Sequence, residues 1–191
     1  MSETIVAGKY RILRRLAAGG MGEVCLASQE GPAGFDKVVA LKRILPNLNE
    51  DKEGIQLFLD EARLVALLSH RNICQITDLG QDKDGYFVAM EYVNGCSVRS
   101  LTEKLRRAKE RLQPFYAIDI ALQVSDALHY AYTTPGRDGQ PLRIIHRDVT
   151  PHNILLSTAG DVKLIDFGVA KSSAQHHHTE TGTVKGKLAY L

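Results

Sequence analysis

The first ninety residues alternate short apolar runs with turn residues. Five runs are rich in β-branched, aromatic and other apolar side chains and predict strands: Tyr10–Leu16, Glu23–Ser28, Lys37–Ile44, Cys74–Leu79 and Tyr86–Tyr92. Asp82-Lys83-Asp84-Gly85 joins the last two, and an Asp-Gly pair between strand patterns is typical of a hairpin. Within residues 55–69 the period changes, because Phe58, Ala62 and Val65 recur at helical spacing. This part therefore predicts five strands and one helix.

The pattern changes after Asn94-Gly95. A short polar helix is predicted over residues 97–107, and Pro114 opens a longer helix. Its apolar face is marked by Phe115, Ile118, Leu122, Ser125 and Leu128. Short β-prone pieces follow at residues 143–145, 154–156 and 162–165, and residues 172–186 predict a loop. A β-rich lobe over residues 8–93 and a helical lobe over residues 94–191 predict a two-lobed α+β fold.

Composition and charge exclude several classes of protein. The 191 residues are 44% hydrophobic, with 24 Lys and Arg against 22 Asp and Glu, which is typical of a globular chain without affinity for nucleic acid or a membrane surface. Three widely spaced cysteines predict reduced thiols rather than disulfides or a zinc site. The first residues lack a signal peptide, and no apolar run approaches the ~20 residues of a membrane span. We therefore expect a cytoplasmic chain without a membrane segment.

Two motifs near the end of the chain carry chemistry. His146-Arg147-Asp148-Val149-Thr150-Pro151-His152-Asn153 is followed, after two strand patterns, by Asp166-Phe167-Gly168. The pair resembles the catalytic loop and the D-F-G motif of protein kinases, with valine in a leucine position. Phosphoryl transfer needs oxygen ligands that hold Mg²⁺ on the phosphates and a carboxylate that orients the attacking hydroxyl. Asp148, Asn153 and Asp166 carry these groups.

A glycine-rich turn precedes the second predicted strand. Ala17–Val24 resembles G-x-G-x-x-G-x-V, with alanine in place of the first glycine. Glycines allow backbone N–H groups to approach phosphate oxygens closely. A dinucleotide-binding fold would need a helix directly after the glycines, whereas Val24–Ala27 is strand-like. A P-loop would need G-K-[ST], which this turn lacks.

The segment Val39-Ala40-Leu41-Lys42 resembles the kinase strand whose lysine pairs the ATP phosphates, and Glu61 on the predicted helix is the expected ion-pair partner of Lys42. Over residues 8–191 the motifs resemble those of eukaryotic-like Ser/Thr protein kinases, particularly the bacterial branch. The resemblance implies ATP and Mg²⁺ as cofactors, a protein Ser/Thr hydroxyl as acceptor, and His146 stacked with Phe167. Implied catalytic residues are Lys42, Glu61 and Asp148, and implied metal ligands are Asn153 and Asp166. Implied ATP contacts are Leu16, Gly19, Gly20, Gly22, Val24, Ala40, Lys42, the gatekeeper Met90, the hinge residues Glu91 and Val93, and Leu155.

The sequence departs from the family pattern at two linked positions. Thr150 follows Asp148 by two residues, where these kinases usually carry a lysine, and Lys187 follows Gly186, where they usually carry a threonine. The family resemblance places the two positions opposite each other beside the catalytic aspartate. We therefore expect an exchange of roles, in which the Lys187 ammonium serves the γ-phosphate as a further catalytic group and the Thr150 hydroxyl bonds Asp148. The alternative is a solvent-facing Lys187 that favours acidic substrates.

Other segments leave alternatives open. The chain stops before any A-P-E motif, so the resemblance implies a truncated catalytic domain with an incomplete helical lobe; a nucleotide-binding or scaffolding pseudokinase fragment without turnover is the alternative to an active kinase. Thr179, Thr181 and Thr183 are candidate autophosphorylation sites, with Thr183 the closest to the family's position. The basic residues within 104–111 are expected to form a solvated helix face rather than a docking surface.

Overall fold

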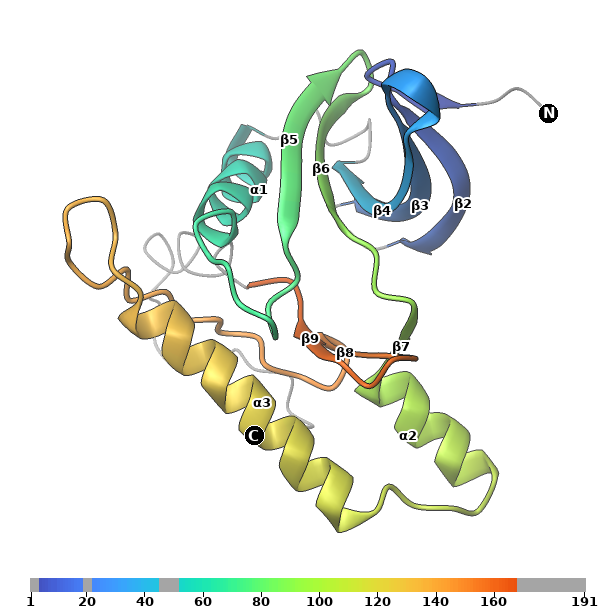
Figure 1. Cartoon of the computed structure of the whole chain (residues 1–191), viewed down its shortest axis with the longest axis vertical. Helices are drawn as coiled ribbons and strands as arrows, with labels where there is room; N and C mark the ends of the chain where they lie inside the picture. The colour runs from blue at the N-terminus through green and yellow to red at the C-terminus, as the bar shows by residue number, and fades with distance from the viewer. Residues whose placement is uncertain (1–3, 19–21, 45–51, 168–191) are drawn as a thin grey trace. The chain divides into compact units, whose positions relative to one another are not determined.

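The computed structural model describes residues 4–18, 22–44 and 52–167 (Figure 1). The chain divides into two compact units, Met1–Asn94 and Gly95–Leu191.

An antiparallel six-stranded sheet forms the first unit, in the order β1-β2-β3-β4-β6-β5. Its strands are β1 (Ile5–Val6), β2 (Tyr10–Ala18), β3 (Gly22–Glu30), β4 (Asp36–Ile44), β5 (Ile76–Asp82) and β6 (Gly85–Glu91). The five predicted strands are all present, and the two-residue β1 adds a sixth. Pro32–Gly34 forms a short 3₁₀ helix between β3 and β4, and the predicted hairpin turn joins β5 to β6 with Asp82 opposite Gly85.

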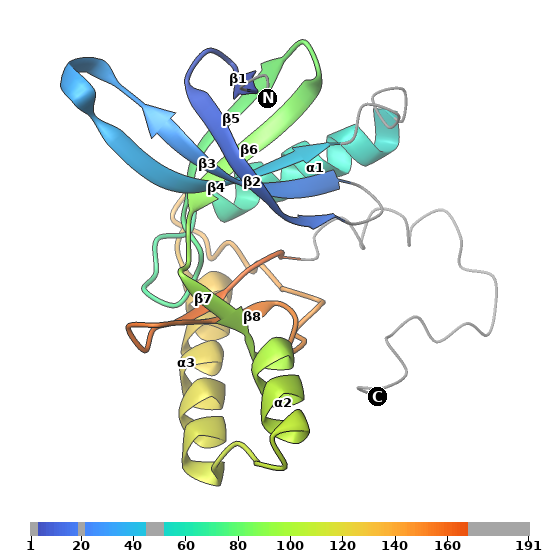
Figure 2. The same cartoon turned by 90° about the vertical axis from the view of Figure 1, so that its right-hand side faces the viewer.

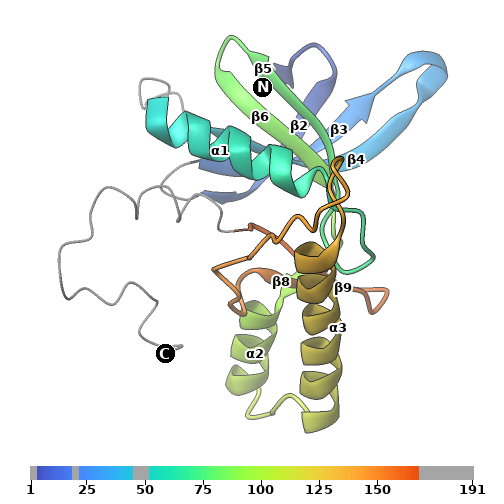
Figure 3. The same ribbon diagram turned by 90° about the vertical axis from the view of Figure 1, so that its left-hand side faces the viewer.

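The helix of this unit, α1 (Lys52–Val65), lies beside β5 (Figures 1 and 3). It ends four residues earlier than the predicted 69. The amides of Leu67 and Leu68 bond to the carbonyls of Leu64 and Val65, three residues back rather than four. This tightening into turns ends the α-helix although the apolar pattern continues to Leu68, which is buried.

A buried polar contact lies beside the core of the first sheet. The fully buried Tyr10 packs edge-on against Phe87, with ring centroids 5.5 Å apart. Its hydroxyl donates to Asp78 Oδ2 at 2.8 Å, and Lys9 Nζ lies 2.8 Å from the same oxygen. Burial raises the pKa of Asp78, but the hydrogen bonds from Lys9 and Tyr10 lower it by more, so its pKa lies below the ordinary value.

Tyr10→Phe should therefore destabilise the chain by about 2 kcal/mol, because it removes a hydrogen bond to a charged group. Asp78 contributes stability that is present above its unfolded-state pKa and is lost as pH falls through its lowered folded-state pKa. Without the tyrosine that folded-state pKa rises toward the unfolded-state value, so the pH-dependent loss of stability should be smaller and should be complete at a higher pH. Urea unfolding across pH 3–7 measures both effects. Tyr86→Phe on β6 is the matched control, and an equal loss in both variants would contradict the assignment.

The second unit combines a small sheet with two helices, which lie side by side in Figures 2 and 3. Its elements are β7 (Gly95–Ser97), α2 (Val98–Arg107), α3 (Pro114–Thr133), β8 (Ile154–Ser157) and β9 (Val162–Leu164), with sheet order β7-β8-β9. Ser97 caps α2 by accepting a hydrogen bond from the Ser100 amide at 3.1 Å. No helix that the structure describes has the length and apolarity to cross a membrane.

The predicted apolar face of α3 is left uncovered in this unit, because Phe115, Ile118 and Leu122 are each more than 60% exposed. The buried residues of α3 are instead Val124, Ala127 and Ala131. Residues 143–145 form no strand; the amides of Arg143 and Ile144 bond to carbonyls at the end of α3.

Candidate active site

The first unit brings together the predicted lysine and glutamate. Lys42 lies on β4 and Glu61 on α1, and Lys42 Nζ is 3.5 Å from Glu61 Oε1. Their side chains are 25% and 18% exposed, so the ion pair is partly shielded from water. Lys42 Nζ also lies 5.9 Å from the centre of the Phe58 ring on α1. This cation–π contact further limits the positions that the ammonium group can take.

The strand register gathers further predicted residues on the face that carries Lys42. Val24 pairs with Lys42 across β3 and β4, and Ala40 pairs with Met90 across β4 and β6. Directly paired residues share a face of a sheet, and so do residues two apart on one strand. Val24, Ala40, Lys42 and Met90 therefore share one face. Leu16 lies in the irregularity of β2 opposite this part of β3 and is 37% exposed.

Gly22 begins β3 where two backbones approach closely. A Cβ atom at this position would lie 2.3 Å from the carbonyl oxygen of Arg43 on β4. No side chain fits there, so the last glycine of the predicted turn is required by strand packing. Gly19 and Gly20 lie outside the described residues.

The predicted hinge begins at the end of β6. The Glu91 amide donates to the Gln75 carbonyl at 2.9 Å, and Glu91 Oε1 accepts from the Gln75 amide at 2.8 Å. These bonds fix the backbone at Glu91. Val93, two residues later, lies outside any strand or helix.

Glu61→Gln should lower the catalytic efficiency of the chain about 10²-fold, because Lys42 would lose its charged partner and shift from its position. The substitution preserves the size of the side chain, so folding should change little. Glu53→Gln, in the exposed first turn of the same helix, is the control for a change of charge alone. Steady-state phosphorylation kinetics of both variants provide the measurement, and equal efficiencies would contradict a positioning role for Glu61.

The second unit holds the predicted catalytic loop in a network of short bonds. Asn153 Nδ2 donates to the Asp148 backbone oxygen at 3.0 Å and to its carboxylate oxygen Oδ2 at 3.1 Å. The Asn153 amide donates to the Thr150 carbonyl at 2.9 Å, and the Arg99 amide on α2 donates to the Pro151 carbonyl at 2.9 Å. These contacts could not be predicted from the sequence, because the motif gives the residue types but not which side chain hydrogen-bonds to Asp148.

His146 links the catalytic loop to the segment after β9 through hydrogen bonds. Its Nδ1 accepts from the Asp148 amide at 3.2 Å, so its Nε2 is the protonated nitrogen that donates to the Ile165 carbonyl at 3.0 Å. Burial lowers the pKa of His146 below its ordinary value, although the Ile165 bond and nearby Asp148 oppose the shift. The neutral ring contacts Phe167, with centroids 4.6 Å apart. The predicted stacking of these two rings is therefore present.

The predicted metal ligands Asn153 and Asp166 lie on neighbouring backbone segments at one end of β8 and β9. Ile154 pairs with Leu164, and the Ile165 amide donates to the Asn153 carbonyl at 2.9 Å, which places Asn153 beside the segment leading into Asp166. Because Asn153 Nδ2 is used on Asp148, its Oδ1 is the atom left for a cation. A carboxylate and an amide oxygen suit Mg²⁺. No group of three His, Cys, Asp or Glu residues suited to a metal occurs in the described part of the chain.

One residue in each of the two predicted motifs has a strained backbone. Arg147 and Asp166 have positive φ angles of 62° and 53°. Residues other than glycine rarely adopt this backbone conformation, and those that do are often found at functional sites. Thr150 is 6% exposed, and its hydroxyl oxygen is buried without a hydrogen-bond partner among the described residues. The expected bond from Thr150 to Asp148 is therefore not formed.

The remaining predicted positions cannot be placed beside these groups. Leu155 lies on β8 in the second unit, half-buried and paired with Lys163. The predicted catalytic Lys187 and the candidate phosphorylation sites Thr179, Thr181 and Thr183 lie outside the described residues.

Similarity to known proteins agrees with this arrangement. The protein kinase domain family matches residues 10–191. The chain belongs to this family. Tyrosine-protein kinase MasK of Myxococcus xanthus is 40% identical over 185 residues, which cover 96% of this chain and 28% of MasK. Serine/threonine-protein kinase PrkC of Bacillus subtilis is 35% identical over 186 residues, which cover 97% of this chain and 26% of PrkC.

A solved structure supports the fold. The crystal structure of the Mycobacterium tuberculosis PknI kinase domain is similar with a TM-score of 0.68 and 29% identity, covering 88% of this chain and 63% of that one. The predicted α+β protein kinase fold is thus confirmed. The chain spans about a quarter of the length of MasK and PrkC, so it corresponds to one part of such proteins.

Proposed function

We propose that this chain is a catalytic part of a kinase that transfers the γ-phosphoryl group of ATP to a Ser or Thr hydroxyl of a protein. The observation that carries the proposal is the Asp148–Asn153 pair, in which one amide orients the carboxylate and keeps an oxygen for a cation. Family membership supports it. Because ATP and reduced thiols are cytoplasmic, we also assign the chain to the cytoplasm.

Each residue has a distinct task in the proposed reaction. Lys42, held by Glu61, binds the phosphates of ATP, and the sheet face with Val24, Ala40 and Met90 contacts adenine. Asn153 and Asp166 would hold Mg²⁺, which supplies charge neutralisation on the phosphates when bound. Asp148 orients the acceptor hydroxyl and accepts its proton.

A second candidate function is phosphorylation of tyrosine. The 40% identity to a protein named as a tyrosine kinase favours it, whereas PrkC and PknA of Mycobacterium tuberculosis, which is 34% identical, are named as Ser/Thr kinases. The acceptor hydroxyl of a tyrosine lies farther from its backbone than that of serine, so the two activities differ in the depth at which the peptide binds.

One experiment tests these candidates together with the fragment alternative. The purified chain and its Asp166→Asn variant are incubated with γ-labelled ATP, Mg²⁺ and a generic basic protein, and acid hydrolysis then identifies the labelled amino acid. Label on serine or threonine in the unsubstituted chain alone is the expected result. Label on tyrosine would support the second candidate. Nucleotide binding without transfer would support a pseudokinase fragment.

We further propose that Thr183 is phosphorylated by the kinase itself and pairs with Arg147. The Arg147 side chain is exposed and forms no ion pair with any described residue. A phosphate of about −2 charge near its guanidinium would order the neighbouring loop. Thr183→Ala should lower activity about tenfold or more, whereas Thr179→Ala should change it little. Mass spectrometry and kinetics check both; wild-type activity of Thr183→Ala with all three threonines unmodified would contradict the proposal.

A further inference from the structure

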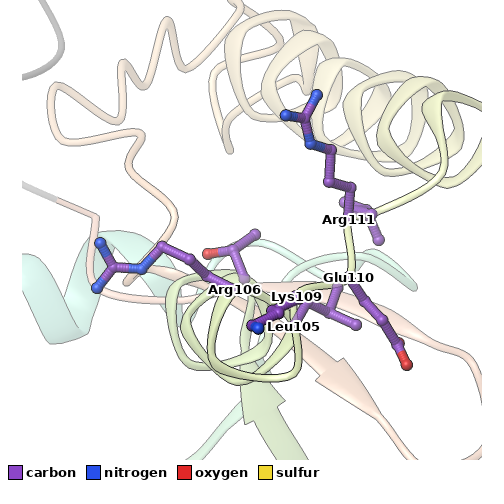
Figure 4. A pocket seen from close by; sticks show the side chains of 7 residues that line it. Leu105, Arg106, Lys109, Glu110 and Arg111 are labelled. Carbon is purple, nitrogen blue, oxygen red and sulfur yellow. The ribbon is translucent and has the colours of Figure 1, made fainter.

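A pocket lies at the end of α2, on the connection to α3 (Figure 4). Its volume is about 520 Å³, and it is lined by Thr102, Leu105, Arg106, Lys109, Glu110, Arg111 and Leu112. The two leucines and Thr102 are half-buried, and the charged residues are exposed. The pocket therefore combines an apolar floor with a charged rim, and nothing in the proposed phosphoryl transfer uses it.

Helix geometry separates the pocket residues from other basic residues nearby. Thr102, Leu105 and Arg106 follow the i, i+3, i+4 spacing, so they share one face of α2. Lys104 and Arg107 lie on the opposite side of the same turns and do not line the pocket. The sequence pattern predicted a single solvated basic face, but the structure divides these residues between two faces.

Charge concentrates in this segment. Residues 104–111 contain five basic side chains and one acidic one, a formal charge of +4, while the whole chain carries +2. Among the described residues, Arg106, Lys109 and Arg111 form no ion pair, so their charges are available to a ligand. The C-terminus of α2 contributes a partial negative charge of about half a unit from the helix dipole. The charged side chains that line the pocket carry a larger net positive charge, so the pocket stays positive.

The backbone holds Lys109 at the pocket in an unusual conformation. Its φ angle is 59°, at the position after the helix where glycine is common. The Lys109 amide bonds to the Arg106 carbonyl, and the Glu110 amide bonds to the Leu105 carbonyl, which together complete the helix cap. The sequence thus has a lysine at a lining position of the pocket where a glycine would avoid the backbone strain.

We propose that this pocket binds an acidic segment of a protein partner. Figure 4 shows the guanidinium groups of Arg106 and Arg111 pointing to separate places, so one small anion would not satisfy both. An extended segment with carboxylates spaced along it would reach both arginines and Lys109. An apolar side chain between those carboxylates would lie against Leu105 and Leu112. This binding does not depend on phosphoryl transfer.

The test measures binding directly with the full chain. A fluorescein-labelled peptide Glu-Asp-Leu-Asp-Glu-Leu-Glu-Asp is titrated and followed by fluorescence anisotropy at low and high salt. Saturable binding that weakens with salt is expected. Arg106→Glu with Arg111→Glu should weaken it about tenfold or more. Lys104→Glu with Arg107→Glu makes the same change of charge outside the pocket and should weaken binding by less than about threefold.

Three outcomes would overturn the proposal. The first is equal weakening in the two double variants, which would indicate attraction to overall charge alone. The second is no saturable binding of the peptide. The third is pocket-dependent binding of a single-stranded oligonucleotide or an anionic lipid vesicle more tightly than the peptide, which would indicate another class of partner. Circular dichroism checks that each variant folds, and Arg106→Gln with Arg111→Gln replaces the reversal if it does not, with a threefold loss expected.

Discussion

Asp148→Asn should slow phosphoryl transfer at least about 10³-fold while leaving ATP binding nearly unchanged. The substitution keeps the shape of the side chain but removes the carboxylate that accepts the proton of the acceptor hydroxyl. The hydrogen bond from Asn153 Nδ2 to Oδ2 at 3.1 Å shows that this carboxylate is held in one orientation. An amide in its place can still orient the hydroxyl, but it has no basic oxygen to receive the proton.

The measurement compares kcat with the dissociation constant for ATP in both proteins. Asp119→Asn is the matched control, because Asp119 is exposed on α3 and its carboxylate accepts a hydrogen bond from Gln123 on the same helix at 2.9 Å. A variant at Asp148 that retains more than a tenth of the activity would contradict its proposed role. So would an equal loss of ATP affinity, since that would make Asp148 a nucleotide-binding residue.

The parts of the fold that depend on near neighbours could be predicted from the sequence. The hairpin at Asp82–Gly85 could be predicted because an Asp-Gly pair favours a tight turn between two strands. The start of α3 needs only Pro114 in the first helical turn. The ion pair between Lys42 and Glu61 was predicted from motif order, although 19 positions separate the residues.

The parts that depend on distant packing could not be predicted. The apolar residues of α3 at positions 115, 118 and 122 gave the stronger periodic pattern, yet the small residues Ala127 and Ala131 are the ones packed against the unit. Small side chains allow close approach of helix and sheet, which a hydrophobicity pattern undervalues. β7 was missed because Gly95 has no strand preference; a Cβ there would lie 1.8 Å from the Leu156 carbonyl oxygen.

The second large effect is expected at the exchanged pair of residues. Lys187→Thr should lower kcat about 10²–10³-fold, the usual effect of losing one group that stabilises developing charge. Adding Thr150→Lys should restore a good part of that activity, because residues that share one task are not additive. The structure bears on one half of the exchange only. The buried Thr150 hydroxyl oxygen has no partner among the described residues and so does not bond Asp148, and the prediction therefore rests on Lys187 as the group that serves the γ-phosphate.

The size of the rescue depends on how position 150 accommodates a lysine. Thr150 is buried, so the new side chain must keep its alkyl stem within the loop and extend its ammonium toward solvent or phosphate. Lys185→Thr makes the same change two residues earlier and is the control, with kcat expected to stay within about threefold of wild type. An unchanged kcat in Lys187→Thr with a raised KM for the peptide would contradict the exchange and would instead indicate that Lys187 attracts acidic substrates.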